Sequence, residues 1–251
     1  MTDIASEPAP ARQPALSGQT VVLIGGSSGI GLQTARRVRA EGADVVITGR
    51  DPERLRQAAV EVGARGQAAF DATEAGRLAA FFGSLPDAVD HVLVTAGGPY
   101  YAPLAEMDLA DAGRHLAEQI VLILEVARQA AGTVRPGGAL LLMSGTGARR
   151  PAVGISVSAA LTAALPALAA NLALELAPVR VNVIAAGFVD TPLSASLLGA
   201  GIEERRERLR ATLPIRRVVV ADDVAALAVH LMTNTALTGA TFDVDGGQQL
   251  L

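Results

Sequence analysis

The sequence of 251 residues contains no lysine and no cysteine, and its only tyrosines are the neighbours Tyr100 and Tyr101. The absence of cysteine excludes disulfides, thiolate nucleophiles and cysteine-ligated metals. The three histidines, His91, His115 and His230, do not have the spacing of metal ligands, so no metal centre is expected. The absence of lysine excludes any catalytic step that needs a lysine ammonium group.

Charge and composition favour a single compact domain. The net charge is −4, and the basic residues, all arginine, are mixed with acids and form no block of one sign, so no nucleic-acid partner is expected. The length and the 50% hydrophobic content fit one large α/β domain. We expect a flexible tail over residues 1–17, which is rich in alanine and proline, and a domain over residues 18–251. The tail lacks the pattern of a signal peptide, which favours a cytoplasmic location.

One uncharged stretch, Ala152–Leu174, is long enough to cross a membrane. Pro166 and several small or polar residues interrupt its apolar character, and the stretch lies between two strand-like segments of an alternating chain. We therefore expect a buried core helix or an interface helix, and no membrane partner.

Short β-branched runs alternate with amphipathic segments from Gln19 onward, which is the pattern of βαβ units. The sequence predicts a Rossmann-type α/β fold, with a doubly wound seven-stranded parallel sheet and helices on both faces. Ligands of such sheets bind beyond the carboxyl ends of the strands. The predicted strands are Val21–Ile24, Asp44–Thr48, Gln67–Phe70, His91–Thr95, Ala139–Met143, Arg180–Ala185 and Thr241–Val244.

The turn after the first predicted strand is rich in glycine. It reads Gly25-Gly26-Ser27-Ser28-Gly29-Ile30-Gly31 and opens a predicted helix. Glycines let the backbone turn tightly and approach a pyrophosphate, while the helix N-terminus offers free amides and a positive dipole end. The alternative is a flexible turn without a ligand. The spacing Gly-x-x-x-Gly-x-Gly after the first strand resembles that of the short-chain dehydrogenases/reductases.

The resemblance covers nearly the whole chain. Thr95-Ala96-Gly97 is similar to the family's turn after the fourth strand, and Gly187 with Asp190-Thr191-Pro192 is similar to its nicotinamide-side loop. Leu172 to Pro178 with Val181-Asn182-Val183, and Thr238 to Gly247, resemble its later helix and strands. The resemblance implies a nicotinamide dinucleotide cofactor. The residues expected to bind it are Gly25, Ser27, Ser28, Gly29, Ile30, Gly31, Arg50, Asp71, Ala72, Ala96, Gly97, Gly98, Gly187, Val189 and Thr191.

The end of the second predicted strand bears on the choice of nucleotide. Arg50 stands where an NAD enzyme would offer an acid to the adenosine ribose, and arginine there favours a 2′-phosphate. We therefore expect NADP(H) in preference to NAD(H). Asp51 can compete as the ribose acid, but Asp51-Pro52 is also a good helix start. Asp71 resembles the family residue that meets the adenine ring, and it is equally suited to capping a turn.

The catalytic positions of the family are all substituted. The resemblance places the family's tyrosine at Ser158, its lysine at Thr162, its substrate-binding serine at Gly145 and its helix asparagine at Gln119. A serine without help is a far weaker acid than the family's tyrosine and sits on a shorter arm. Pro166 has no N–H and clashes with the carbonyl of Thr162, so the helix can bend there or tolerate a kink.

Three nearby residues are candidates for the missing chemistry. Tyr100 and Tyr101 follow the turn after the fourth strand, where a phenol can donate a proton or stack on a substrate, although aromatic residues in turns often only pack. Ser144 ends the fifth predicted strand and can bond a carbonyl oxygen or cap its own turn. Arg149 and Arg150 can hold an anionic substrate or remain solvated.

Three functional hypotheses follow. The first is an NADP(H)-dependent oxidoreductase that transfers a hydride to an activated carbonyl-type acceptor, with solvent, Tyr100 or Tyr101 as proton source. The second is a non-catalytic nucleotide-binding protein that acts as a sensor or partner subunit, and the third is a non-redox enzyme such as one for elimination. The family commonly assembles through helices that correspond to Leu109–Ala131 and Ala152–Ala177, which implies a homodimer or homotetramer.

Overall fold

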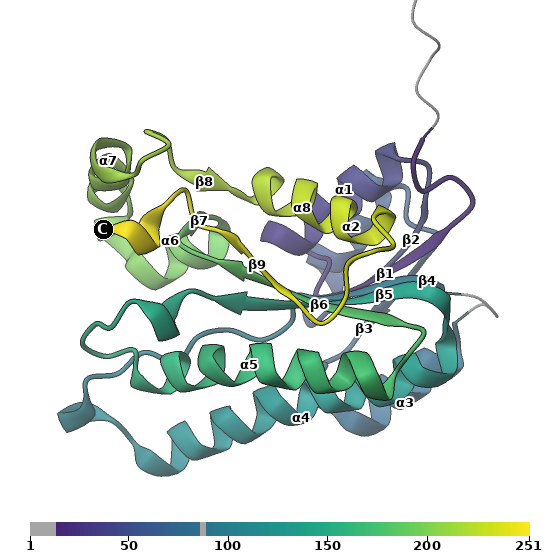
Figure 1. Ribbon diagram of the computed structural model, residues 1–251, viewed down its shortest axis with the longest axis horizontal. Coiled ribbons are helices and arrows are strands. Elements are labelled where there is room, and N and C mark those ends of the chain that lie inside the picture. The colour runs from purple at the N-terminus through teal and green to yellow at the C-terminus, as the bar shows by residue number, and fades with distance from the viewer. Residues whose placement is uncertain (1–13, 86–88) are drawn as a thin grey trace, which may run out of the picture.

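A seven-stranded parallel sheet forms the centre of the molecule, as predicted (Figure 1). The structure is a computed structural model, and it describes residues 14–85 and 89–251. The strand order is β3-β2-β1-β4-β5-β6-β9, so successive strands are added on one side of β1 up to β3 and on its other side from β4 onward. The strands are β1 (Thr20–Ile24), β2 (Asp44–Gly49), β3 (Gly66–Ala69), β4 (Val89–Val94), β5 (Val134–Gly145), β6 (Arg180–Ala186) and β9 (Thr241–Val244).

Helices cover both faces of the sheet (Figure 1). One face carries α1 (Gly29–Ala40), α2 (Pro52–Val62) and α8 (Ala221–Thr233), and the other carries α3 (Ala75–Gly83), α4 (Leu109–Thr133) and α5 (Ser156–Glu175). Beyond the carboxyl ends of the strands lies a lobe made of α6 (Pro192–Leu198), α7 (Ile202–Thr212) and the paired strands β7 (Val189–Asp190) and β8 (Val219–Val220). Short 3-10 turns are η1 (Leu104–Glu106), η2 (Gly147–Arg149), η3 (Gly199–Gly201) and η4 (Gln248–Leu250).

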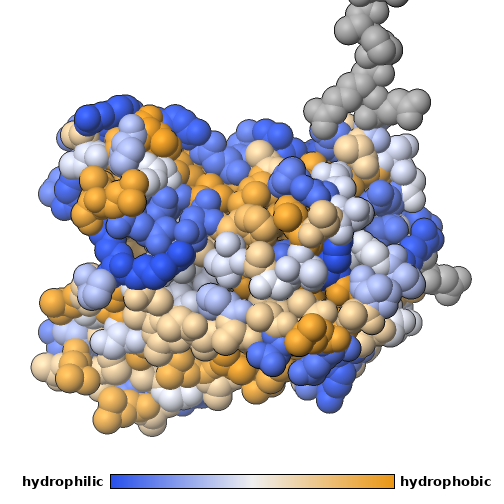
Figure 2. Space-filling model, in the orientation of Figure 1, coloured by the Kyte–Doolittle hydropathy of each residue, from blue (hydrophilic) through white to orange (hydrophobic). Residues whose placement is uncertain are grey.

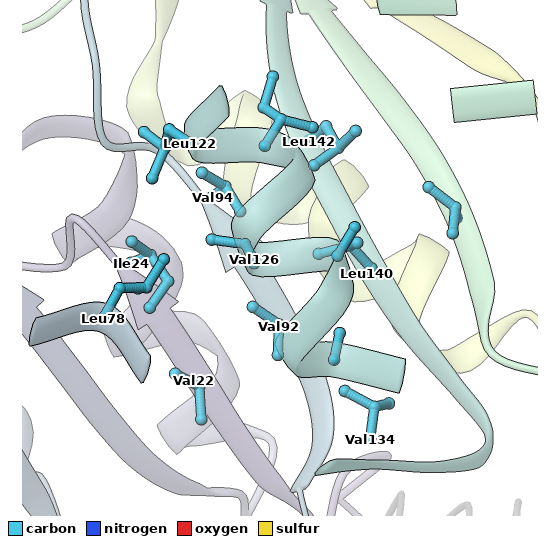
Figure 3. Packing of buried hydrophobic residues seen from close by; sticks show 14 of the residues in the cluster. Val22, Ile24, Leu78, Val92, Val94, Leu122, Val126, Val134, Leu140 and Leu142 are labelled. Carbon is cyan, nitrogen blue, oxygen red and sulfur yellow. The ribbon is translucent and has the colours of Figure 1, made fainter. Parts of the chain in front are cut away.

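The core consists of two apolar layers, one on each face of the sheet. Successive side chains of a strand point to opposite faces, so Val22 and Ile24 join one layer while Val21 and Leu23 join the other. Strands buried on both faces are expected to be apolar throughout, and all five residues of β1 are buried. Figure 3 shows the layer beneath α4, with Val92, Val94, Leu122, Val126, Leu140 and Leu142 in one cluster.

The segment before β1 contributes one residue to the core. Residues 1–13 of the expected tail lie outside the described residues, and within residues 14–17 only Leu16 is buried. The Leu16 side chain is fully buried in the core layer of α1 and α2, and its N–H donates to the Glu41 carbonyl at 2.9 Å. Leu16 thus fills a place in the core, and the domain boundary at residue 18 stays a prediction.

The uncharged stretch forms α5, which is continuous through Pro166. The helix is long and apolar enough to cross a membrane, and 28% of its apolar window is buried. Leu165, Ala169 and Leu172 pack against the sheet, whereas Leu174 is exposed. Figure 2 shows that the surface over α4 and α5 is mostly apolar. The helix thus covers one face of the sheet, as expected, and its role as an interface stays a prediction.

His91 is a buried histidine inside β4, with 4% of its surface exposed. Its Nδ1 accepts the Ala139 N–H at 3.1 Å, so Nε2 carries the proton that is donated to Gln19 Oε1 at 2.7 Å. Burial, helped by the charge of Arg180, lowers the pKa of His91 to about 3. The folded protein therefore holds the neutral imidazole at neutral pH.

This buried imidazole predicts an acid-sensitive stability. An unfolded histidine has a pKa near 6.5 and binds a proton that the folded one rejects, so the free energy of unfolding falls as pH falls from about 6.5 toward about 3. Between pH 6.5 and 5, where few carboxylates titrate, His91 contributes a slope of up to about 1.4 kcal/mol per pH unit. Urea unfolding at several pH values measures it. We expect a shallower slope in His91→Gln and an unchanged one in His230→Gln, whose histidine is exposed. Equal slopes in both variants would refute this origin.

Candidate dinucleotide-binding and catalytic site

The glycine loop between β1 and α1 is folded so tightly that no side chain fits at two of its positions. A Cβ at Gly31 would lie 2.2 Å from the Gly25 carbonyl oxygen, and a Cβ at Gly25 would lie 2.7 Å from the Ala96 nitrogen. Gly25 has a φ of 103°, which glycine adopts readily. The Thr95 hydroxyl donates to the Gly25 carbonyl at 2.9 Å. The loop is thus held against the end of β4.

The start of α1 has the features of an anion site. Ser28 is the N-cap, but its hydroxyl caps no helix N–H, and the first turn contains no acid to offset the positive end of the helix dipole. A Cβ at Gly29 would lie 3.7 Å from the Thr191 side chain, which shows that the loop after β7 comes up beside the glycine loop. Backbone amides and hydroxyls at this helix start are therefore suited to meeting a diphosphate.

The other expected cofactor residues lie at the same edge of the sheet. Gly97 has a φ of 110° and passes close to the side chain of Gln119, since a Cβ there would lie 2.1 Å from Gln119 Oε1. A Cβ at Gly187 would lie 2.7 Å from the Asp245 Cβ. Val189 and Ala72 are buried, and Ser27 and Ile30 are directed toward β2 and the core. Every expected cofactor residue follows the carboxyl end of a strand.

Three charged side chains follow β2 and β3. They are Arg50, which is unpaired among the described residues, and Asp51 and Asp71, which accept hydrogen bonds from residues close to them in the chain. Arg50 is exposed and forms no ion pair with any described residue. The Asp51 carboxylate accepts the N–H groups of Glu53 and Arg54, both at 3.0 Å, and caps α2. Asp71 accepts the N–H and hydroxyl of Thr73, and this backbone hydrogen bond lowers the pKa of Asp71. Arg50 is thus the group available to an incoming anion.

Ser158 holds the loop after β4 onto α5. Its hydroxyl donates to the Tyr100 carbonyl at 2.8 Å and accepts the Tyr100 N–H at 2.9 Å. The Ala102 N–H also donates to the Gly154 carbonyl at 2.9 Å. We name this set of contacts, between residues 100–102 and 154–158, the loop clasp. Ser158 is a buried residue, with 8% of its surface exposed. Its hydroxyl is engaged both as a donor and as an acceptor.

Thr162, one turn further along α5, is engaged in a similar way. Its hydroxyl donates to the Ala159 carbonyl and accepts the Ala148 N–H, both at 3.0 Å. It thereby fixes the turn η2 after β5. A Cβ at Gly145 would lie 3.3 Å from the Thr162 methyl group, so a larger residue at 145 would press on Thr162.

The chain is similar to known proteins along nearly its full length. Residues 24–249 match the family model described as enoyl-(acyl carrier protein) reductase. An uncharacterized oxidoreductase of Mycobacterium tuberculosis is 31% identical, and the match covers 92% of each chain. A structure described as a short chain dehydrogenase/reductase family protein is 32% identical and has a TM-score of 0.81, covering 94% of this chain and 100% of that one.

The chain is a short-chain dehydrogenase/reductase. A further solved structure, of a small-chain dehydrogenase in complex with NADPH, is 27% identical with a TM-score of 0.80 and covers 93% of this chain and 99% of that one. The sequence resemblance to the family is therefore confirmed.

The hydroxyls of Ser158 and Thr162 both serve the structure of the fold. A proton donor must present a free O–H to the substrate, but the Ser158 hydroxyl is bound to the Tyr100 backbone and the Thr162 hydroxyl to the Ala159 carbonyl. No lysine exists to assist either. These two residues secure loops, and their correspondence to the family's tyrosine and lysine stays a prediction.

The three expected catalytic residues, Tyr100, Tyr101 and Ser144, differ in exposure and in hydrogen bonding. The Tyr100 hydroxyl donates to the Asp108 carbonyl at 3.3 Å, and its ring lies 5.6 Å from that of His115. Tyr101 is 57% exposed, and desolvation of its phenol by neighbouring groups raises the pKa of Tyr101. The Ser144 hydroxyl is buried and bonds no other described residue. The Ser144 hydroxyl makes no hydrogen bond to either tyrosine, so their joint role stays a prediction.

The two arginines that can hold an anionic substrate, Arg149 and Arg150, lie in different surroundings. Arg149 forms a bidentate ion pair with Asp243 on β9, including Nη1 to Oδ2 at 2.9 Å. Arg150 instead lines a cleft with Arg205 and Arg208 of α7. No motif in the sequence distinguishes these two α7 arginines. Their only signal was the charged run from Glu203 to Arg210, which gives no indication of which helix face is paired.

The loop clasp predicts a measurable effect of Ser158→Ala. The Tyr100 N–H and carbonyl would lose their partner, which costs about 1–3 kcal/mol of stability for buried groups. Hydrogen exchange of the Tyr100 amide should accelerate, and urea unfolding should shift to lower concentration. Ser156→Ala, at the exposed first residue of α5, is the matched control and should change neither. An unaltered Tyr100 exchange rate in Ser158→Ala would show that the clasp does not hold the loop.

Proposed function

We propose that this protein binds NADP(H) in the crevice at the carboxyl ends of β1, β2, β4 and β6. The observation that carries the proposal is the glycine loop, where a Cβ at Gly31 would lie 2.2 Å from the Gly25 carbonyl. This close passage leaves the N-terminus of α1 open to a diphosphate. The solved relative with bound NADPH supports the same nucleotide.

The residues divide by the part of the nucleotide that they would hold. Ser27, Ser28 and Gly29 with Thr191 would meet the diphosphate, and the unpaired Arg50 would meet the adenosine 2′-phosphate. Asp71 and Ala72 would border the adenine. Gly97 and Gly98, with Gly187 and Val189 across the sheet, would border the nicotinamide. Because Arg50 favours a phosphate, NADP(H) is proposed over NAD(H).

We further propose an oxidoreductase activity on activated carbonyl-type acceptors. The bound nicotinamide would supply a hydride, and the chain's own task is to position an acceptor and provide a proton. With Ser158 and Thr162 engaged in structure, the proton comes from solvent or from the phenols of Tyr100 and Tyr101, and Ser144 can bond the acceptor oxygen. Loss of a positioned general acid costs about 10²–10⁴-fold in rate, which slows hydride transfer to an activated acceptor without preventing it.

A second candidate is a non-catalytic nucleotide-binding protein that acts as a sensor or partner subunit. The specific observation in its favour is that the hydroxyls of Ser158 and Thr162 are fully used within the fold. A cytoplasmic homodimer or homotetramer is proposed in either case, because the apolar surface over α4 and α5 suits burial against another subunit (Figure 2).

The role assigned to Arg50 predicts a change of nucleotide preference. Arg50→Ala should weaken NADPH binding about 10- to 100-fold, since charge-assisted hydrogen bonds contribute about 1.5–3 kcal/mol, and should leave NADH binding within about twofold. Fluorescence titration with both nucleotides measures this. Arg128→Ala, on α4 and paired with Glu125, is the matched control and should bind both as the parent does. Equal losses for NADPH and NADH would contradict a contact to the 2′-phosphate.

The oxidoreductase proposal predicts slow oxidation of NADPH with a panel of dicarbonyl, quinone and activated ketone acceptors. The loss of absorbance at the nicotinamide band measures this oxidation. In Tyr100→Phe/Tyr101→Phe, a fall in kcat of about 10²-fold or more would assign the proton to a phenol, and an unchanged kcat would assign it to solvent. Binding of NADPH without turnover of any acceptor would replace this proposal by the second candidate. Failure to bind either nucleotide would favour a non-redox enzyme.

A further inference from the structure

Three arginines that face one cleft have no ionic partner among the described residues, whereas many other arginines are paired with acids. Arg36 pairs with Glu61 and Arg37 with Asp222, for example. Arg150, Arg205 and Arg208 form no ion pair or side-chain hydrogen bond within residues 14–85 and 89–251, the part that the structure describes. They line a cleft of about 210 Å³, completed by Leu209, Thr212 and Leu251. We call this the arginine cleft.

The arginine cleft is formed by segments that are far apart in sequence. Arg150 follows the turn η2 after β5, and Arg205 and Arg208 lie three positions apart on α7, hence on one helix face. Figure 2 shows a notch between the lobe that carries α7 and the layer that carries α5, with strongly hydrophilic residues on its floor. The chain ends beside this notch (Figure 1). The cleft therefore opens at the same edge of the sheet as the nucleotide crevice.

One of the three guanidinium groups is held in place by an aromatic ring. The Arg205 guanidinium lies over the Phe188 ring at 5.6 Å from its centroid, and Phe188 follows β6. Such stacking restricts the side chain and leaves its N–H groups free at the edge of the plane. The Phe188 N–H is in turn fixed by the Gln248 side chain at 2.9 Å. Arg205 is thus positioned without using its hydrogen-bond donors.

The electrostatics of α7 set this face apart from the rest of the helix. Arg206 pairs with Asp190 and Glu203, and Arg210 pairs with Glu203, so the cations on the other faces are neutralised. At Arg205, burial and the like charges of Arg208 and Arg150 lower the pKa. Like charges held together in this way repel, and a bound anion would remove that repulsion.

We propose that the arginine cleft is a binding site for the phosphoryl group of a small phosphorylated ligand. Three guanidinium groups match a dianion, and their planar forks suit the oxygens of phosphate. A volume of about 210 Å³ admits a phosphoryl group with a short ester but is smaller than the pockets of drug-sized ligands. If the protein is the proposed oxidoreductase, this site would select a phosphorylated acceptor, but binding itself does not depend on turnover.

Inorganic pyrophosphate is the probe for a direct test. We expect saturable binding by calorimetry at low ionic strength, weakened by salt because partly exposed charges are screened. Arg205→Ala and Arg208→Ala should each weaken it at least tenfold, and Arg205→Lys should fall between these and the parent because lysine lacks the planar fork. Arg210→Ala, on the same helix but paired with Glu203, is the matched control and should bind as the parent does.

Two further measurements separate this site from the nucleotide crevice. NADPH affinity and the urea midpoint should be unchanged in Arg205→Lys, which shows that the fold and the crevice are intact. Pyrophosphate affinity should also be unchanged in Arg50→Ala. If Arg50→Ala abolishes pyrophosphate binding while the α7 variants keep it, the anion occupies the crevice and the inference is overturned. Tighter binding of succinate than of pyrophosphate would overturn the phosphoryl assignment.

Discussion

The close passage of the beginning of α1 against the carbonyl of Gly25 is the constraint on which the candidate site depends. Only hydrogen atoms fit between Gly31 and that carbonyl, and Thr95, directly after the neighbouring β4, anchors the same oxygen. This contact fixes α1 at the end of β1 with its first amides uncovered. The strand order places the loops after β1 and β4 side by side, at the point where the order of successive strands along the sheet reverses.

The candidate nucleotide site and the hydroxyls of α5 lie on different segments of the fold. The candidate nucleotide site is built from backbone geometry at the ends of the strands. The resemblance to the family implies proton transfer from side chains of the helix that corresponds to α5, and there the hydroxyls of Ser158 and Thr162 secure the loop after β4 and the turn after β5. In this structure both hydroxyls have a structural role.

Arginine is the only long basic side chain available, and its pairing shows where anions are expected. Many arginines are bound to carboxylates, such as Arg149 to Asp243 and Arg206 to Asp190. Unpaired guanidinium groups occur at Arg50, beside the nucleotide crevice, and on the cleft face of α7. Because arginine stays charged at all physiological pH values, these groups are permanently cationic and do not act as proton donors. Both proposed phosphate sites therefore rest on guanidinium groups that no described carboxylate neutralises.

The sequence alone determined the sheet, the glycine loop and the absence of lysine. Strand periodicity, glycine spacing and the absence of a residue type are local properties, and they can be read without knowing which segments meet. The tertiary structure decided that Leu16 belongs to the core and that Ser158 binds the backbone of Tyr100. It also decided that Arg149 pairs with Asp243 while Arg150 does not pair with a described acid. It also brought Arg150 to the α7 arginines and made His91 a neutral, buried group. Each of these depends on contacts between residues distant in the chain, and such contacts are set only when the layers pack.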